Sequence, residues 1–193
     1  MKKIFLLVIA TCLGFVSSAQ TVSHISLKES VLKWKGSQLF DFNNHYGTVK
    51  FKEGYLDMAG NAIKGGSFVV DMNTITNTDG KYNESLVDHL KNEDFFEVSK
   101  YPTSQLKITE INNDLGMSMT VKADLTIKGI TNQVEFQAQK ANKGEQLIIT
   151  AKFIIDRSKW NVKYGSQSFF KNLGDETISD AIEFEVRLVI EKC

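Results

Sequence analysis

The chain has 193 residues, with 23 basic side chains against 23 acidic ones and therefore no formal net charge. This balance argues against a nucleic-acid-binding protein, because such proteins usually present a strongly basic face. The length suits a single domain with enough residues to bury a substantial core.

The first residues are typical of a secretory signal peptide. Two lysines follow the initiating methionine, residues 4–10 form an apolar run, and small side chains precede the cleavage point. We expect cleavage after Ala19, which assigns 1–19 to the signal peptide and 20–193 to one mature domain, secreted or periplasmic. The apolar run is too short to span a bilayer, so no membrane-spanning segment is expected. Lipoprotein processing at Cys12 is a less favoured alternative.

The mature chain keeps one thiol. Cys12 leaves with the signal peptide, so Cys193 has no partner for an intrachain disulfide. Pairing of Cys193 between two chains would give a homodimer, although a frayed end without function is the favoured interpretation.

Apolar and polar residues alternate along most of the chain, and the clearest run extends from Met117 to Ile127. A strand sends successive side chains to opposite faces, so this pattern indicates a sheet with one apolar and one wet face. Closing such a sheet removes its edges, and we predict an all-β protein built as a closed antiparallel barrel. The predicted strands are 31–35, 47–51, 55–58, 66–73, 103–111, 117–128, 133–139, 146–156 and 181–191.

Two features interrupt the predicted strands. Glu53-Gly54 is interpreted as a turn between two of them. Residues 83–92 carry Leu86, Val87 and Leu90 at helical spacing, which predicts one short helix that caps or flanks an end of the barrel.

The polar residues do not form a recognisable catalytic or metal-binding motif. His24, His45 and His89 lie outside HExxH and cysteine-rich arrangements, and the chain has no P-loop, GxSxG or dinucleotide fingerprint. We therefore predict no catalytic residue, no metal and no resident cofactor. A lipid-modifying enzyme that uses His45, Asp88, His89 or Arg157 as acid, base or head-group ligand is a less favoured alternative.

Aromatic residues gather in the connections between strands, at 38–46, 95–96 and 158–172. Each one alone is more often core than ligand contact, but their clustering also fits the mouth of an apolar tunnel. Arg157 either pairs with a carboxylate such as Asp156, which is favoured, or holds a polar ligand head. The predicted ligand-binding residues are Trp34, Phe40, Phe42, His45, Phe51, Phe68, Phe95, Phe96, Leu125, Phe136, Phe153, Arg157, Trp160, Phe169 and Phe170.

Five motifs together resemble one protein family. The longest, Asp88 to Val98, contains Asp-His-Leu and Asp-Phe-Phe and is followed by Tyr101-Pro102. The others are Ala123–Thr131 (ADLTIKGIT), Ile155–Trp160 (IDRSKW), His45–Gly47 and Asp71–Ile75. On these residues the chain resembles the YceI-like family of secreted, polyisoprenoid-binding bacterial proteins.

The resemblance implies a closed antiparallel lipocalin-like barrel of about eight strands with one short helix. It also implies a long apolar tunnel for an isoprenoid chain, such as a quinone or polyprenyl lipid. It implies a binding protein for storage, shielding or transport rather than an enzyme. Burial of ~10 methylene equivalents would contribute roughly 8 kcal/mol to such binding. The loop from Trp160 to Phe170 is longer and more aromatic than this family implies. An envelope interaction module that uses the barrel as a scaffold is a further alternative, and an exposed apolar patch would support it.

Overall fold

The computed structural model describes residues 20–39, 44–113 and 117–191. The sequence predictions on the signal peptide, Cys12, Phe40, Phe42 and Cys193 lie outside these ranges. The elements in chain order are β1 (Gln20–His24), β2 (Val31–Ser37), β3 (Asn44–Ala59), β4 (Ala62–Asn77), α1 (Asn83–Lys91), β5 (Thr103–Asn113), β6 (Ser118–Ile127), β7 (Ile130–Lys143), β8 (Gln146–Asp156), the 3₁₀ helices η1 (Arg157–Trp160) and η2 (Gly174–Glu176), and β9 (Ala181–Glu191).

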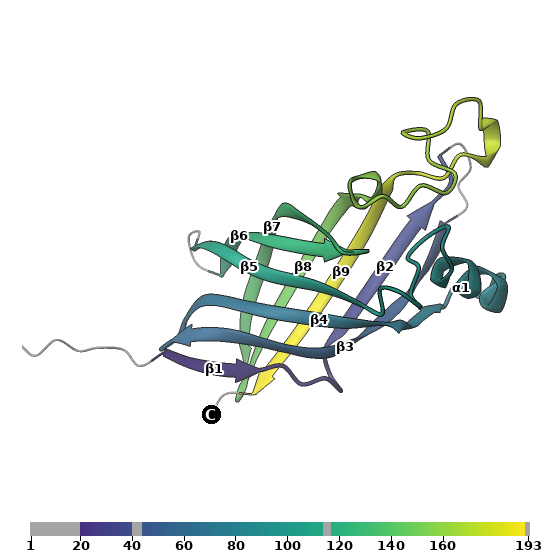
Figure 1. Ribbon diagram of the computed structural model, residues 1–193. Coiled ribbons are helices and arrows are strands. Elements are labelled where there is room, and N and C mark those ends of the chain that lie inside the picture. The colour runs from purple at the N-terminus through teal and green to yellow at the C-terminus, as the bar shows by residue number, and fades with distance from the viewer. Residues whose placement is uncertain (1–19, 40–43, 114–116, 192–193) are drawn as a thin grey trace, which may run out of the picture.

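The strands form one antiparallel sheet that closes on itself. Its order is β1-β3-β2-β9-β8-β7-β6-β5-β4, and pairing of β3 with β4 completes the barrel. Strand β1 is the extra strand, because it pairs with the end of β3 that extends beyond β2. Helix α1 and the loop that contains η2 lie at the same end of the barrel, which we call the helix end (Figure 1). The predicted closed barrel of eight strands with one short helix is confirmed.

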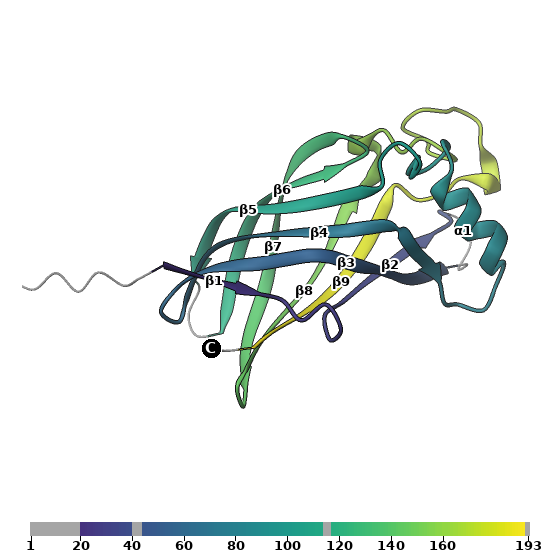
Figure 2. The ribbon, with the colours of Figure 1, turned by 60° about the horizontal axis from the view of Figure 1, so that its bottom comes forward.

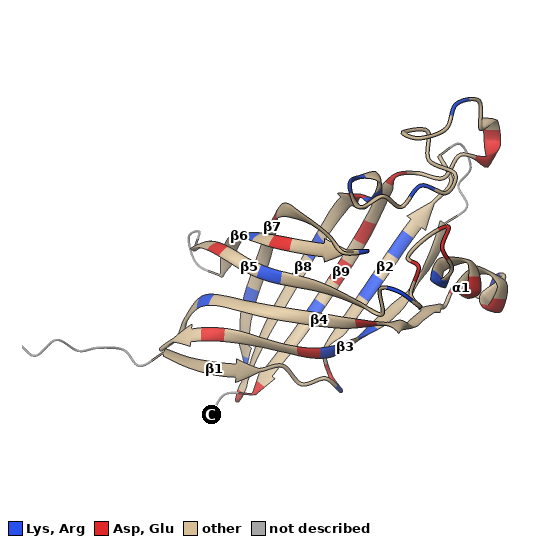
Figure 3. Ribbon diagram, viewed as in Figure 1, with Lys and Arg blue, Asp and Glu red and all other residues tan. Residues whose placement is uncertain are grey.

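The alternation in β6 explains the two faces of the wall. Its side chains are buried and half-buried in turn along the whole strand. The strand pairs with β7 without a register shift, from Ser118 opposite Gln139 to Ile127 opposite Ile130. Figure 3 shows charges of both signs spread along the strands, with no wall of a single sign. The apolar faces turn inward and form the core.

The predicted turn at Glu53-Gly54 is wrong. Strand β3 continues through both residues, and a register shift against β4 between Phe51 and Glu53 takes up the irregularity. A Cβ on Gly54 would lie 2.7 Å from the Ile25 side chain and 2.8 Å from that of Phe68. The glycine therefore permits close packing inside a strand, rather than a change of direction.

Helix α1 closes the barrel on one side of the helix end, beside the segment that leads into β5 (Figure 2). Leu90 is buried, while Leu86 and Val87 pack half-buried against the core. Phe95 and Phe96, directly after the helix, are also buried. In the described ranges, no helix has the length and apolar character needed to cross a membrane.

Candidate functional site

An apolar cavity of about 190 Å³ lies inside the barrel. Side chains from all eight strands of the closed barrel line it, and Leu90, Phe95 and Phe96 line it at the helix end. The polar lining residues are Ser104, Gln105, Ser179 and Arg157. An apolar cavity of ~150 Å³ in another protein stays dry and binds benzene, so a cavity of this kind suits an apolar guest.

Most of the predicted ligand-binding residues line this cavity. On the strands, the inward half of each alternation supplies them, as predicted from the pattern. Those in the lining are Trp34, Phe51, Phe68, Phe95, Phe96, Leu125, Phe136, Phe153 and Arg157.

Aromatic rings form one continuous part of the wall. The rings of Phe136 and Phe153 stack with centroids 4.4 Å apart, and Phe153 lies 5.5 Å from Phe184. Phe184 also lines the cavity but is absent from the sequence prediction. It alternates with Glu183 and Glu185 on β9, so its inward position was available from the same pattern.

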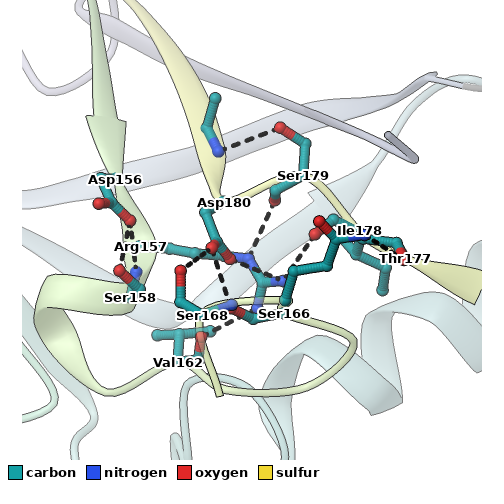
Figure 4. Close-up of polar contacts among 12 residues, drawn as sticks. Asp156, Arg157, Ser158, Val162, Ser166, Ser168, Thr177, Ile178, Ser179 and Asp180 are labelled. Carbon is teal, nitrogen blue, oxygen red and sulfur yellow. Dashed lines mark hydrogen bonds and ion pairs between the residues drawn. The ribbon is translucent and has the colours of Figure 1, made fainter. Parts of the chain in front are cut away.

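Arg157 is a buried cation at the cavity wall, held mainly by backbone carbonyls (Figure 4). Nε donates to the oxygen of Ser179 at 3.1 Å, Nη1 to that of Val162 at 2.9 Å and Nη2 to that of Ile178 at 3.2 Å. Nη2 also lies 3.4 Å from a carboxylate oxygen of Asp180. Burial lowers the pKa of the Arg157 guanidinium below its usual value, and the nearby carboxylates oppose this shift.

Asp180 connects this cation to the loop between η1 and β9. Its Oδ2 accepts hydrogen bonds from the hydroxyls of Ser166 at 2.9 Å and Ser168 at 2.7 Å. Asp156, the partner suggested by sequence, instead accepts the backbone N–H and hydroxyl of Ser158 at the start of η1. The ion pair therefore joins segments on both sides of the loop, as Figure 4 shows.

A second, mixed-polarity cavity of about 750 Å³ lies at the helix end, and we call it the vestibule. Ile178 lines both the vestibule and the apolar cavity, so the two adjoin. Burial lowers the pKa of Lys128 in the vestibule, the positive charge of Lys163 adds to this shift, and Glu97 opposes it. The vestibule is lined by Gln38, Glu93, Asp94, Lys128, Asn161, Lys163, Tyr164, Gly165, Phe170, Leu173, Glu176 and Ile178.

Trp160 and His45 lie outside the lining of the apolar cavity. Trp160 is fully buried, and its Nε1 donates to the carbonyl oxygen of Leu125 at 2.9 Å, which joins η1 to β6. His45 Nδ1 lies 2.6 Å from Oδ2 of Asp79. The Trp160 hydrogen bond fixes η1 against the barrel wall, and the His45 contact links β3 to the segment that follows β4.

The loop aromatics Phe169 and Phe170 are partly exposed to solvent, with 41% and 48% of their surface accessible. Phe170 lines the vestibule. Tyr164, which the sequence prediction did not include, lies 4.3 Å from the His89 ring and 5.6 Å from the Phe95 ring, measured between centroids. It therefore joins the loop to the segment at helix α1.

The residues of the enzyme alternative do not gather around the apolar cavity. Among His45, Asp88, His89 and Arg157, Arg157 alone lines it, and three of its N–H groups donate to backbone carbonyl oxygens. Asp88 is exposed, and His89 lies 3.3 Å from Asp94. In the part of the chain that the structure describes, no group of three or more His, Cys, Asp or Glu side chains is placed to hold a metal ion.

Solved structures share this architecture at low sequence identity. BcnA of Burkholderia cenocepacia has 20% identity and a TM-score of 0.70, over 86% of this chain and 98% of that protein. A polyisoprenoid binding domain from Saccharophagus degradans has 14% identity and a TM-score of 0.63, over 92% of this chain and 100% of that domain. The YceI protein of Campylobacter jejuni has 15% identity and a TM-score of 0.57, with 100% of each chain covered. The sequence matches no curated protein.

The sequence itself identifies the family. These structural likenesses show a common fold, and the YceI-like domain family matches residues 23–190 of this chain. That match extends from β1 into the end of β9 and so includes the whole barrel. The chain therefore belongs to the YceI-like family.

Proposed function

We propose that this protein binds an isoprenoid or similar amphiphilic lipid, such as a quinone or polyprenyl lipid, inside its barrel. It would store, shield or carry this lipid in the periplasm or outside the cell, after removal of residues 1–19. The apolar cavity, lined from all eight strands of the barrel, is the observation that carries the proposal. The Saccharophagus degradans relative, described as a polyisoprenoid binding domain, agrees with it.

In this proposal, the apolar cavity holds the isoprenoid chain of the lipid and the vestibule holds its polar head. The isoprenoid chain lies among the rings of Phe136, Phe153 and Phe184, where an apolar guest loses no hydrogen bonds to water. The polar head lies in the vestibule, where Gln38 and Asn161 offer amide donors and acceptors. Both charge signs line the vestibule, which favours a neutral polar head over a strongly charged one.

The first experiment identifies the guest. The secreted mature protein is purified without detergent and extracted with organic solvent, and the extract is analysed by mass spectrometry. A stoichiometric isoprenoid supports the proposal and names the lipid. A clean extract, together with no uptake of added quinone or polyprenol, would reject it in favour of a protein that acts through its outer surface.

A pair of variants on β7 tests whether the lumen is the binding site. Ala138 is 2% exposed and lines the cavity, so Ala138→Phe places a ring in the space proposed for the guest. The adjacent Gln139 is exposed, which makes Gln139→Phe a matched control on the outer face. Overpacking costs about 1–3 kcal/mol, so the circular dichroism of both variants must first show a folded barrel. We expect Ala138→Phe to take up at least tenfold less lipid than wild type, and Gln139→Phe to take up as much as wild type. Equal lipid uptake by the two variants would contradict a lumenal site.

A further inference from the structure

Three aromatic side chains are exposed on the segment between η1 and η2, residues 161–173, which we call the aromatic loop. Tyr164, Phe169 and Phe170 expose 44%, 41% and 48% of their surface. The loop projects beyond the barrel at the helix end (Figure 1). Exposed apolar patches mark interaction sites, and these three rings lie within seven residues on one projecting loop.

Basic residues accompany these aromatics. The exposed side chains of Lys159, Lys163 and Lys171 lie on or next to the loop, and the sequence from 157 to 174 contains no acidic residue. Lys163 Nζ lies 5.3 Å from the centroid of the Phe169 ring. Aromatic rings that enter a bilayer interface, beside lysines that attract anionic head groups, are the usual composition of a membrane-contacting segment. Acidic residues follow in η2, so the electrostatic attraction is local to the loop.

The fold holds the aromatic loop in one shape. The Ser166 backbone oxygen accepts the N–H groups of Phe169 at 3.2 Å and Phe170 at 3.0 Å. The Asp180 carboxylate binds the hydroxyls of Ser166 and Ser168, and the Ile178 N–H donates to the oxygen of Gly165 at 2.8 Å. A loop that is already ordered loses little conformational entropy when it meets a partner.

The aromatic loop also forms part of the entrance to the proposed lipid site. Tyr164 and Phe170 line the vestibule, which adjoins the apolar cavity at Ile178. We propose that the aromatic loop docks this protein on an anionic lipid bilayer, with Phe169 and Phe170 inserted at the interface. This inference rests on the proposed function, because docking here places the mouth of the lipid site against the membrane. A lipid then passes between bilayer and barrel without crossing water.

The test is flotation of the mature protein with vesicles of phosphatidylcholine, with and without phosphatidylglycerol, and free of isoprenoids. We expect the wild type to float with the anionic vesicles, and Phe169→Ser/Phe170→Ser to lower its partition coefficient at least tenfold. Ile154, 64% exposed on the outer wall of β8, supplies the control, since Ile154→Ser removes an even more exposed apolar side chain elsewhere. It should change the partition coefficient less than twofold. Lys163→Gln/Lys171→Gln should weaken binding about fivefold or more, and only with anionic vesicles.

Three results would overturn the inference: a wild type that does not float, a double phenylalanine variant that floats like the wild type, or an Ile154→Ser variant that is equally impaired. If the wild type does not float, sedimentation velocity without vesicles tests whether it self-associates instead. Self-association that is lost in Phe169→Ser/Phe170→Ser would identify a second copy of this chain as the occupant of the aromatic loop. Polyprenol uptake, measured in the absence of vesicles, separates the two proposals. A wild type that takes up polyprenol but does not float refutes docking alone, and one that floats without uptake refutes the lumenal function alone.

Discussion

Replacement of Arg157 by methionine tests whether this residue primarily stabilises the barrel end or binds ligand. Methionine has a similar length and is apolar, so it fills much of the same space without the guanidinium donors. The carbonyl oxygens of Val162, Ile178 and Ser179 lose their hydrogen bonds, and Asp180 loses its counter-charge. We expect a large loss of stability with a folded barrel.

The magnitude follows from these contacts. Each buried carbonyl left without a donor costs about 1–3 kcal/mol, and removal of one partner from a buried ion pair costs about 3–5 kcal/mol. The contributions overlap, because one side chain makes them all, and methionine avoids the desolvation of the guanidinium. We therefore expect the free energy of unfolding to fall by about 3–5 kcal/mol. For a domain of this size, that lowers the Tm by about 10–15 °C.

Urea unfolding, followed by tryptophan fluorescence and circular dichroism, measures this loss. Arg157→Lys keeps the charge but not the three-way geometry, and it should lie between wild type and Arg157→Met. Asp180→Asn keeps an acceptor for the serine hydroxyls and leaves the three carbonyl acceptors of Arg157 in place, so it should cost less than Arg157→Met. An Arg157→Met variant within about 1 kcal/mol of wild type would refute the reasoning. A variant of full stability with impaired lipid uptake would instead assign Arg157 to the ligand.

Gly47→Ala should unfold the barrel or lower the free energy of unfolding in urea by more than about 4 kcal/mol, because the new Cβ would lie 1.7 Å from a backbone oxygen of β4. Gly36→Ala is the control, because a Cβ there has no atom within 4 Å, and it should cost less than about 1 kcal/mol. Burial alone would raise the pKa of Asp79, but hydrogen bonds from a backbone N–H, His45 and an asparagine side chain outweigh it and lower that pKa. The stability that Asp79 contributes is therefore present above its unfolded pKa and lost as the pH falls below about 4, and Asp79→Asn should flatten the fall in unfolding free energy between about pH 5 and pH 2. Trp160→Phe removes a buried indole hydrogen bond and should lower the free energy of unfolding by about 1–3 kcal/mol. Its lipid affinity, measured by fluorescence titration, should stay within about twofold of wild type. A stable variant with weak binding would contradict this role.

The barrel was predictable because its signal repeats on strand after strand. Residues 118–127 show strict alternation, and the wall buries one face there as the pattern predicts. Strand β1 gives no such signal, since its five residues carry no fully buried side chain, and the strand exists through backbone pairing with β3. Gly54 misled the prediction, because sequence does not distinguish a glycine needed for a turn from one needed for close packing.

The site was predictable where it lies on strands and less so where it lies on loops. Alternation places residues such as Phe68 and Phe136 inward, and both line the cavity. Trp160 carries the same aromatic signal, yet its indole serves a hydrogen bond between η1 and β6. The vestibule joins residues as distant in sequence as Gln38 and Glu176, so tertiary structure alone brings them together. Loop composition indicated aromatic character at the barrel end but not which rings face water.

The size of the lumen limits how a long lipid enters it. A cavity of about 190 Å³ is only slightly larger than one of ~150 Å³ that holds benzene, whereas several isoprene units occupy far more space. The wall resists widening, because each of its eight strands is hydrogen-bonded to a neighbour on both sides. The extra space must therefore come from rotation of lining side chains and from displacement of Leu90, Phe95 and Phe96, which no ladder of strand hydrogen bonds restrains. The helix end, where the aromatic loop and the vestibule meet, is thus the part of this barrel that can open at the lowest cost.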